Sequence, residues 1–177
     1  STLTSDQDAP KIILELNKFL KSDDIIIPEI IEDNLSSLVY YIDGNLIQTD
    51  NTGIDISTLD DGQHSLTINA LDKFGLKSSE TFDFVVDKRL PSLELLSQNN
   101  SKISKRLDIQ VSVSDQNLPN SDYLSFLLPN GERILDKKSY SFDTSNLDEG
   151  KYSVQVYTQD KAKNILSSKI IFEIDHS

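Results

Sequence analysis

The sequence predicts an all-β protein made of two tandem β-sandwich domains, each with about seven strands and no disulfide. Three observations carry this prediction. The second half of the chain repeats the first, most of both halves alternate polar and apolar residues, and the chain contains no cysteine. Alternation with a period of two is typical of strands that bury one face. Short strands separated by turn residues at regular spacing favour a sandwich.

The repeat sets the domain boundaries. An offset of 88 residues aligns residues 59–66 with 147–154, and the match continues without a gap until Asp87 meets Asp175. Solenoid repeats have periods of roughly 20 to 50 residues, so this repeat is a whole domain. We therefore expect one domain over residues 1–88 and a second over residues 89–177. The joint between them, residues 87–91, has no Gly or Ser run, and a linker this short restricts relative motion.

The first two strands are the least regular. The first is expected at residues 11–16, although its apolar residues, with Phe19 and Leu20, also fit one face of a helix. The corresponding run at 92–96 is followed by a turn at 98–100, and the repeat favours a strand at both places. The next strand, at 25–32, contains Pro28, which has no backbone N–H and interrupts the ladder.

Turn residues and alternation place the other strands. Asp43-Gly44 separates a strand at 37–43 from a short one at 46–49, and a strand at 53–57 follows. Residues 64–71 alternate polar and apolar, and the last strand, 80–87, places Phe82 and Phe84 on one face. The second domain repeats this pattern, with strands expected at 92–96, 106–114, 122–128, 132–135, 139–143, 151–158 and 168–175.

Charge and composition exclude several classes of function. The net charge of −12 argues against binding to nucleic acid or to anionic membranes, both of which need basic patches. No apolar run approaches the roughly 20 residues of a membrane helix, and no signal peptide is visible. The chain starts at Ser1 without Met, and we expect it to be a fragment of a larger protein.

An enzymatic function is not expected. The two histidines, His64 and His176, fall at a strand corner and near the end of the chain, and neither belongs to a catalytic motif. The sequence contains no Gly-x-Ser-x-Gly elbow, no phosphate loop and no His-Glu-x-x-His pair. Nothing singles out two of the 29 acids as a glycosidase pair.

The corner before the sixth strand resembles that of immunoglobulin-like domains. Residues 147–154 read Leu-Asp-Glu-Gly-Lys-Tyr-Ser-Val, and Tyr152 falls where such domains place the tyrosine of the tyrosine corner. His64 takes this place in the first copy, and Leu66 and Val154 stand where antibody-type domains carry cysteines. With Tyr-Tyr-Ile-Asp-Gly at 40–44 and the closing Phe-Val-Val-Asp at 84–87, the chain resembles tandem Ig-like repeats of bacterial and archaeal surface-layer or adhesin-type proteins.

Acidic loop residues are candidate calcium ligands. In a sandwich of this kind, the start of a domain and the loops after its second and sixth strands meet at one pole. For the second domain and the facing pole of the first, this predicts an interdomain calcium site formed by Asp60, Asp61, Asp87, Asp115, Asn117 and Asp160. The equivalent pole of the first domain would offer Asp8, Asp33 and Asp72. The alternative is that these side chains cap turns, and one carboxylate can do both.

The resemblance implies an extracellular, structural role. We expect a spacer segment of a microbial cell-surface or surface-layer protein, located at the cell surface, with neighbouring Ig-like modules and a self-assembly or surface partner as its contacts. No cofactor is required, and calcium is the one candidate. Asn34 and Asn99 lie in Asn-x-Ser sequons and are candidate glycosylation sites. Two alternatives remain open, an adhesion module that binds a glycan or protein through its polar loops, and an accessory domain of a secreted hydrolase.

Overall fold

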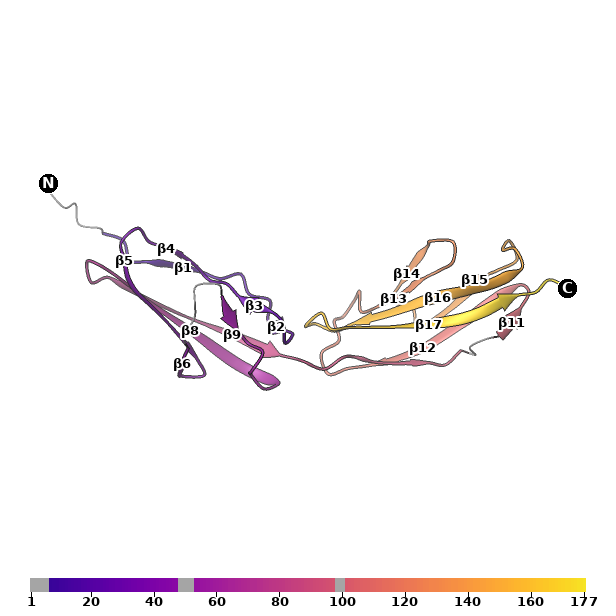
Figure 1. The fold of residues 1–177 in the computed structure, drawn as a ribbon, viewed down its shortest axis with the longest axis horizontal. Coiled ribbons are helices and arrows are strands. Elements are labelled where there is room, and N and C mark those ends of the chain that lie inside the picture. Colours follow the sequence, from indigo (N-terminus) through magenta and orange to yellow (C-terminus); the bar gives the residue numbers. More distant parts are fainter. Residues whose placement is uncertain (1–6, 48–52, 98–100) are drawn as a thin grey trace. The chain divides into compact units, whose positions relative to one another are not determined.

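The computed structural model describes residues 7–47, 53–97 and 101–177. The chain divides into two compact units, Ser1–Lys88 and Arg89–Ser177. The described residues form strands joined by turns, with no helix among them (Figure 1). The same residues accordingly contain no helix with the length and apolarity needed to cross a membrane. The expected fold class, all-β with two tandem sandwiches, is therefore confirmed.

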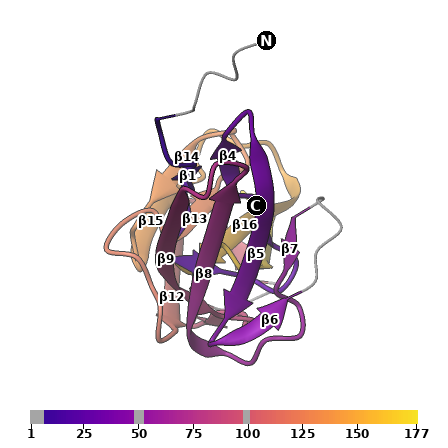
Figure 2. The ribbon, with the colours of Figure 1, turned by 90° about the vertical axis from the view of Figure 1, so that its left-hand side faces the viewer.

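In the first unit, the main sheet has five strands in the order β2-β9-β8-β5-β6. Figure 2 shows β9, β8 and β5 side by side with β6 at the edge. Two small antiparallel pairs, β1-β4 and β3-β7, form the rest of the described strands of this unit. The bounds are β1 Lys11–Ile13, β2 Phe19–Leu20, β3 Ile25–Ile26, β4 Glu29–Ile31, β5 Leu35–Ile42, β6 Asn45–Ile47, β7 Ile54–Asp55, β8 Gly62–Asp72 and β9 Lys77–Val86.

The second unit repeats this arrangement. Its five-stranded sheet has the order β11-β17-β16-β13-β14, and a three-stranded sheet has the order β10-β12-β15. The bounds are β10 Ser92–Leu95, β11 Ser101–Ile103, β12 Arg106–Ser114, β13 Leu124–Leu127, β14 Arg133–Leu135, β15 Ser139–Asp143, β16 Gly150–Gln159 and β17 Ile165–Ile174. Each expected strand of this unit has a counterpart here, with ends that differ by a few residues.

A short strand that the sequence pattern did not predict follows the first strand of each unit. β1 and β10 correspond to the strands expected at 11–16 and 92–96 and pair with β4 and β12, whereas β2 and β11 lie outside those ranges and pair with β9 and β17 of the five-stranded sheets. The chain thus crosses from one sheet to the other near its start, and the apolar residues of β1 and β2 serve both sheets. This crossing explains why Phe19 and Leu20 did not continue a period of two. Pro28 interrupts the second strand as expected, between β3 and β4.

Each unit has its own hydrophobic core. In the first, the alternate apolar residues of β8 and β9 are buried, including Leu66 and Ile68, which are 0% exposed, and Phe84, which is 1% exposed. In the second, Val154, Val156 and Phe172 take the corresponding places. Leu66 and Val154 occupy the positions of the antibody cysteines, and simple apolar packing fills them. At about 25 cal/mol per Å² of buried apolar surface, these cores supply the main stabilisation of each unit.

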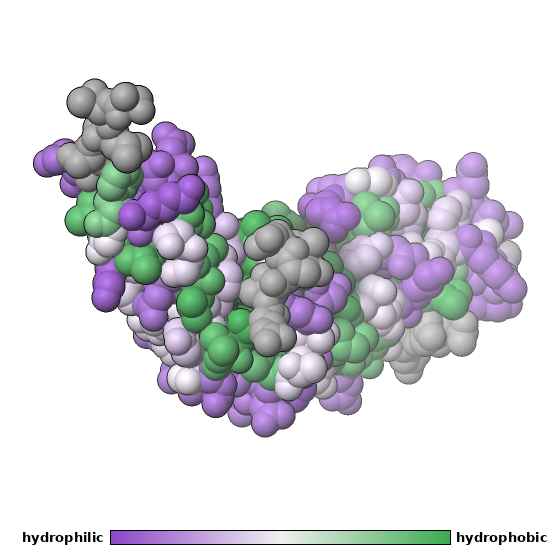
Figure 3. All heavy atoms as spheres, turned by 60° about the vertical axis from the view of Figure 1, so that its left-hand side comes forward, coloured by the Kyte–Doolittle hydropathy of each residue, from purple (hydrophilic) through white to green (hydrophobic). Residues whose placement is uncertain are grey.

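Turn chemistry closes the hairpins. Asp43 and Gly44 join β5 to β6, and both have positive φ, 50° and 79°. Two consecutive residues with positive φ make a type I′ turn, whose twist matches that of the flanking strands. On the surface drawn in Figure 3, apolar residues lie in small groups among polar ones. This is the ordinary pattern for a folded domain.

Candidate functional site

The corner of the second unit is a tyrosine corner. The Tyr152 hydroxyl donates to the backbone carbonyl of Asp148, four residues earlier, at 2.9 Å. The Tyr152 ring stacks on Phe172 of the neighbouring strand at 5.8 Å between centroids. Gly150 begins the strand with φ 147°, a conformation that L side chains rarely adopt. The expected role of Tyr152 is confirmed, and the bond ties the loop before β16 to the sheet.

The first unit builds the same corner from a histidine. Nε2 of His64 lies 2.7 Å from the carbonyl oxygen of Asp60, again four residues earlier, and the ring lies 5.7 Å from that of Phe84. Nδ1 makes a second contact that tyrosine cannot make, at 2.6 Å from Oδ2 of Asp43. The other oxygen of Asp43 accepts a bond from the backbone N–H of Ser65 at 2.9 Å. The turn between β5 and β6 is therefore fastened to β8.

These contacts shift both pKa values. Burial alone would lower the pKa of His64, but the hydrogen bonds to Asp43 and to the Asp60 carbonyl outweigh burial and raise it. The hydrogen bond to His64 holds the pKa of Asp43 below its ordinary value. A carbonyl and a carboxylate are both acceptors, so both ring nitrogens can donate only when the imidazole is protonated. The charged pair is the form in which this corner is fully bonded.

Parallel strand pairs join the start of each unit to its end. In the first unit β2 and β9 run parallel, and the N–H groups of Val85 and Asp87 donate to the carbonyls of Lys18 and Leu20 at 2.7 and 2.8 Å. In the second, β11 and β17 run parallel, and the N–H of Asp175 donates to the carbonyl of Ile103 at 3.0 Å. No local pattern in the sequence signals these pairs, because β2 and β11 have two and three residues.

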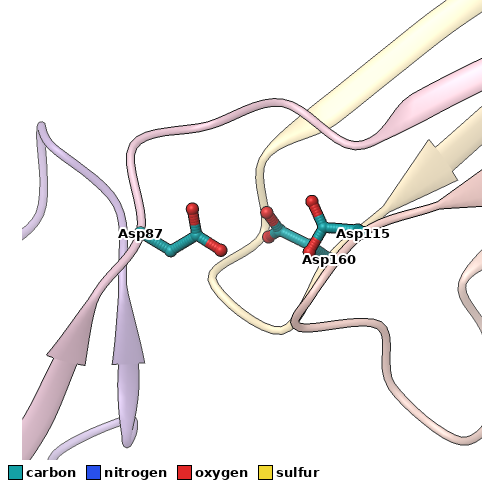
Figure 4. A group of neighbouring side chains, drawn as sticks. All are labelled: Asp87, Asp115 and Asp160. Atoms are coloured by element: carbon teal, nitrogen blue, oxygen red, sulfur yellow. The ribbon is translucent and has the colours of Figure 1, made fainter. Parts of the chain in front are cut away.

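Two of the predicted calcium ligands lie together in the second unit. Asp87 follows β9 in the joint, Asp115 follows β12, and Asp160 follows β16. Asp115 and Asp160 each offer a carboxylate oxygen, and these oxygens lie within 4.8 Å of each other. Figure 4 shows the carboxylates of Asp115 and Asp160 close together where their two loops meet. Asp160 is 1% exposed, so little water screens its carboxylate from that of Asp115.

The carboxylate of Asp160 also caps its own turn. Its two oxygens accept bonds from the backbone N–H and the side-chain amide of Asn164, both at 2.9 Å. Asp115 accepts from the backbone N–H of Asn117 at 2.6 Å, and the carbonyl of Asn117 accepts from the backbone N–H of Lys161 at 2.7 Å. Capping, the alternative role of these acids, is thus present in the same side chains. Capping leaves carboxylate lone pairs that can bind a cation.

Asp60 and Asp61 lie exposed in the loop before β8. Among the described residues of the first unit they form no group of metal-ligating side chains. The Asp60 carbonyl holds His64, and Oδ1 of Asp61 accepts from the backbone N–H of Lys88 at 2.9 Å. Both residues therefore have a local structural role in the first unit.

The corresponding set in the first unit is not brought together in this way. Asp72 is buried and its Oδ1 accepts from the N–H groups of Phe74 and Leu76, both at 2.8 Å, whereas Asp8 and Asp33 are exposed. Within the described residues, these three do not form a group of carboxylates like that of the second unit. Oδ2 of Asp72 is buried without a hydrogen-bond partner among those residues.

Hydrogen bonds also show which residues correspond between the loop after β4 and the loop after β12. The N–H of Lys73 donates to the carbonyl of Asn34, as that of Lys161 does to Asn117. Glu32 accepts from the N–H of Asn34 at 2.8 Å, as Asp115 does from Asn117. Glu32 rather than Asp33 is therefore the counterpart of Asp115. The shared spacing, an acid two residues before an asparagine, is the sequence signal that would have identified it.

Of the two sequons, one lies in the described part of the chain. Asn34 is found in the turn between β4 and β5, partly buried, with its backbone bonded to the turn after β8. Asn99 lies outside the described residues. Glycosylation of either asparagine stays a prediction.

Comparisons with known proteins identify the fold. No family model and no curated protein match the chain. The fibronectin(III)-like modules of Clostridium thermocellum CbhA match it with a TM-score of 0.63 and 16% identity, over 93% of this chain and 94% of theirs. A 1.5-MDa bacterial ice-binding adhesin matches at TM-score 0.45 and 14% identity, over 97% of this chain and 67% of that one. The Ca²⁺-stabilised adhesin of an Antarctic bacterium matches at 0.43 and 13%, over 97% and 50%.

Of these three, only the CbhA modules match with a TM-score above 0.5, and an identity of 16% shows a shared fold alone. The two units share the architecture of tandem immunoglobulin-like and fibronectin(III)-like modules, as the sequence resemblance implied. Because one fold supports many functions, the shared fold does not by itself determine the function of this chain.

Proposed function

We propose that this chain is a non-catalytic spacer segment of a microbial cell-surface or surface-layer protein, placed outside the cell between further modules of the same parent. The observation that carries the proposal is the serial repetition of one sandwich across a joint of five residues, 87–91. Serial copies of a compact domain add length in equal steps. A short joint with no Gly or Ser run limits the freedom between steps.

The terminal strand pairs suit a segment under tension. Force on such a segment enters at the start and end of each unit. β2 and β9, like β11 and β17, are parallel, so pulling on the ends loads their hydrogen bonds in shear. Bonds loaded in shear must break together, whereas bonds at a hairpin end open one at a time. Each unit therefore resists extension at the place where the load arrives.

Single-molecule stretching of the 177-residue chain tests this proposal. We expect two unfolding events, each releasing about 30 nm of chain at roughly 3.5 Å per residue. Asp175→Pro removes the N–H that donates to Ile103 and should lower the force of one event. Asp175→Ala keeps that N–H and is the matched control. A chain that extends without resolved events, or equal forces in the two variants, would contradict a mechanical role.

We propose further that Asp87, Asp115 and Asp160 bind calcium. The support is physical: the carboxylates of Asp115 and Asp160, within 4.8 Å, repel each other, and a divalent cation relieves that repulsion. Calcium takes six to eight oxygen ligands, including backbone carbonyls and water, so the three side chains would supply part of its shell. Asn117, beside Asp115, is a further candidate oxygen donor. No other cofactor is proposed.

Thermal melts in EDTA and in millimolar calcium test the metal. A cation that binds only the folded state at a hundred times its Kd adds about 2.7 kcal/mol. We expect calcium to raise the melting temperature of the chain, and Asp115→Ala and Asp160→Ala to abolish the rise. Glu94→Gln, which removes an exposed acid of the second unit outside the group, is the control and should leave the rise intact. Equal melting temperatures with and without calcium would refute the site.

A further inference from the structure

The outer face of the five-stranded sheet in the second unit carries a hollow that the spacer role does not use. Its volume is about 340 Å³. Its lining comes from the loop before β13 and from β13, β14, β16 and β17, and includes Asp122, Ser125, Arg133, Tyr157, Gln159 and Ile165. A hollow of this size lies at the lower end of the range that small-molecule sites occupy.

The side chains in the hollow combine an aromatic ring with both donors and acceptors. The Arg133 guanidinium lies 5.6 Å from the centre of the Tyr157 ring, and its Nη1 donates to the Ser125 hydroxyl at 3.0 Å. Arg133 has further N–H groups to offer, Asp122 only accepts, and Gln159 can do both. Ile165, 55% exposed, adds apolar surface beside them.

The rim of the hollow is held in place by its own hydrogen bonds. The carboxylate of Asp136 accepts from the backbone N–H groups of Asp122 and Tyr123, at 2.8 and 3.2 Å. The Thr158 hydroxyl donates to the carbonyl of Tyr123 at 2.8 Å. Asp122 itself has φ 60°, a conformation that these bonds stabilise. A preordered rim reduces the entropy lost when a ligand binds.

The first unit has the same face without these residues. In the second unit Ser125 pairs with Tyr157, and in the first Val39 pairs with Asn69. On the edge strand, Arg133 pairs with Leu127, and the corresponding pair in the first unit is Leu46 with Tyr41. Leu46 is therefore the counterpart of Arg133. The fold and the proposed spacer role need neither the ring nor the guanidinium, because the first unit forms the same sheet without them.

We propose that this hollow binds a neutral saccharide. Each hydroxyl of a sugar both donates and accepts, which matches a lining with the donors of Arg133 and the acceptors of Asp122. The C–H face of a sugar ring packs on aromatic and apolar surface, which Tyr157 and Ile165 provide. An acidic peptide fits less well, because the Asp122 carboxylate shares the hollow with the Arg133 guanidinium. A second copy of the chain fits less well too, because each copy carries a net charge of −12.

Exchanging residues between the two units gives a direct test. Tyr157→Asn and Arg133→Leu introduce the side chains that the first unit carries at the same places, so both should leave the sheet folded. The probes are cello-, malto- and manno-oligosaccharides, titrated into the ¹⁵N-labelled chain and followed by NMR shifts of backbone amides. We expect at least one probe to shift the amides of Ser125, Tyr157 and Gln159 together. Each exchange should weaken that binding about tenfold or more, which is a loss of at least about 1.4 kcal/mol.

The control is Asn69→Ala, which changes the counterpart of Tyr157 in the first unit and should leave the affinity unchanged. Three results would overturn the proposal: no shift at these amides with any probe, shifts that persist undiminished in Tyr157→Asn, or shifts that depend on protein concentration without sugar, which would indicate self-association. The number and force of the unfolding events in stretching experiments should be the same in Tyr157→Asn, so failure here is separable from failure of the spacer role.

Discussion

Raising the pH from about 5.5 to about 8.5 should destabilise the first unit, because it removes the second proton of the His64 ring. Both ring nitrogens face acceptors, the Asp60 carbonyl at 2.7 Å and the Asp43 carboxylate at 2.6 Å. A neutral imidazole has one N–H and satisfies only one of them. The other nitrogen then presents a lone pair to an oxygen.

The direction follows from the two pKa shifts. The pKa of His64 is raised on folding, so its contribution to stability is complete below the unfolded value of about 6.5 and disappears as the pH rises through the folded value. The pKa of Asp43 is lowered, so its contribution is present at neutral pH and disappears only on strong acidification. Stability from this pair is therefore greatest in mildly acidic solution.

The magnitude follows from the bond that is lost. A charge-assisted hydrogen bond contributes about 1.5–3 kcal/mol when buried. The Asp43 side chain is 42% exposed, so solvent screening reduces this to about 1 kcal/mol. For a unit of this size, about 1 kcal/mol corresponds to a shift of about 4–8 °C in melting temperature.

Differential scanning calorimetry across this pH range is the assay, with the wild-type chain compared with His64→Tyr. The variant installs the residue that forms the corner in the second unit, where Tyr152 bonds a carbonyl without a titrating group. We expect the pH-dependent shift of the first-unit transition to vanish in the variant. An equal shift in both proteins, or a rise with increasing pH, would refute the account of this corner.

Two further predictions concern the second unit. Thr144 is fully buried and its hydroxyl has no partner among the described residues, whereas its counterpart in the first unit is Ile56. Thr144→Val should therefore raise the stability of the second unit by about 1 kcal/mol, seen as an upward shift of one calorimetric transition. A loss of stability would show that the hydroxyl is bonded. Gly150 has φ 147°, and a methyl group on its Cα would meet no other atom within 4 Å. Gly150→Ala should therefore lower the free energy of unfolding by about 1–3 kcal/mol through backbone strain alone. An unchanged midpoint in chemical denaturation would contradict that reason.

Local patterns in the sequence determined much of this protein. The period-two alternation around Leu66 and Val154 predicted buried strands, and Asp43-Gly44 predicted a hairpin turn, because strands and tight turns depend on residues close together in the chain. The 88-residue repeat predicted two sandwiches and the corner at Tyr152. It also predicted that Asp115 and Asp160 would lie at one pole of the second unit, because the loops after the second and sixth strands of a sandwich meet there.

Tertiary structure alone decided the remainder. Whether Phe19 and Leu20 belong to a helix or cross to the second sheet depends on parallel pairing with β9, at the other end of the same unit, and a two-residue strand has no period of its own. The second contact of His64 requires the β5–β6 turn to lie beside β8, and the hollow at Tyr157 requires Arg133 to cross from the edge strand. These contacts join residues far apart in sequence, so they follow from the packing of the sheets and leave no pattern that the chain displays locally.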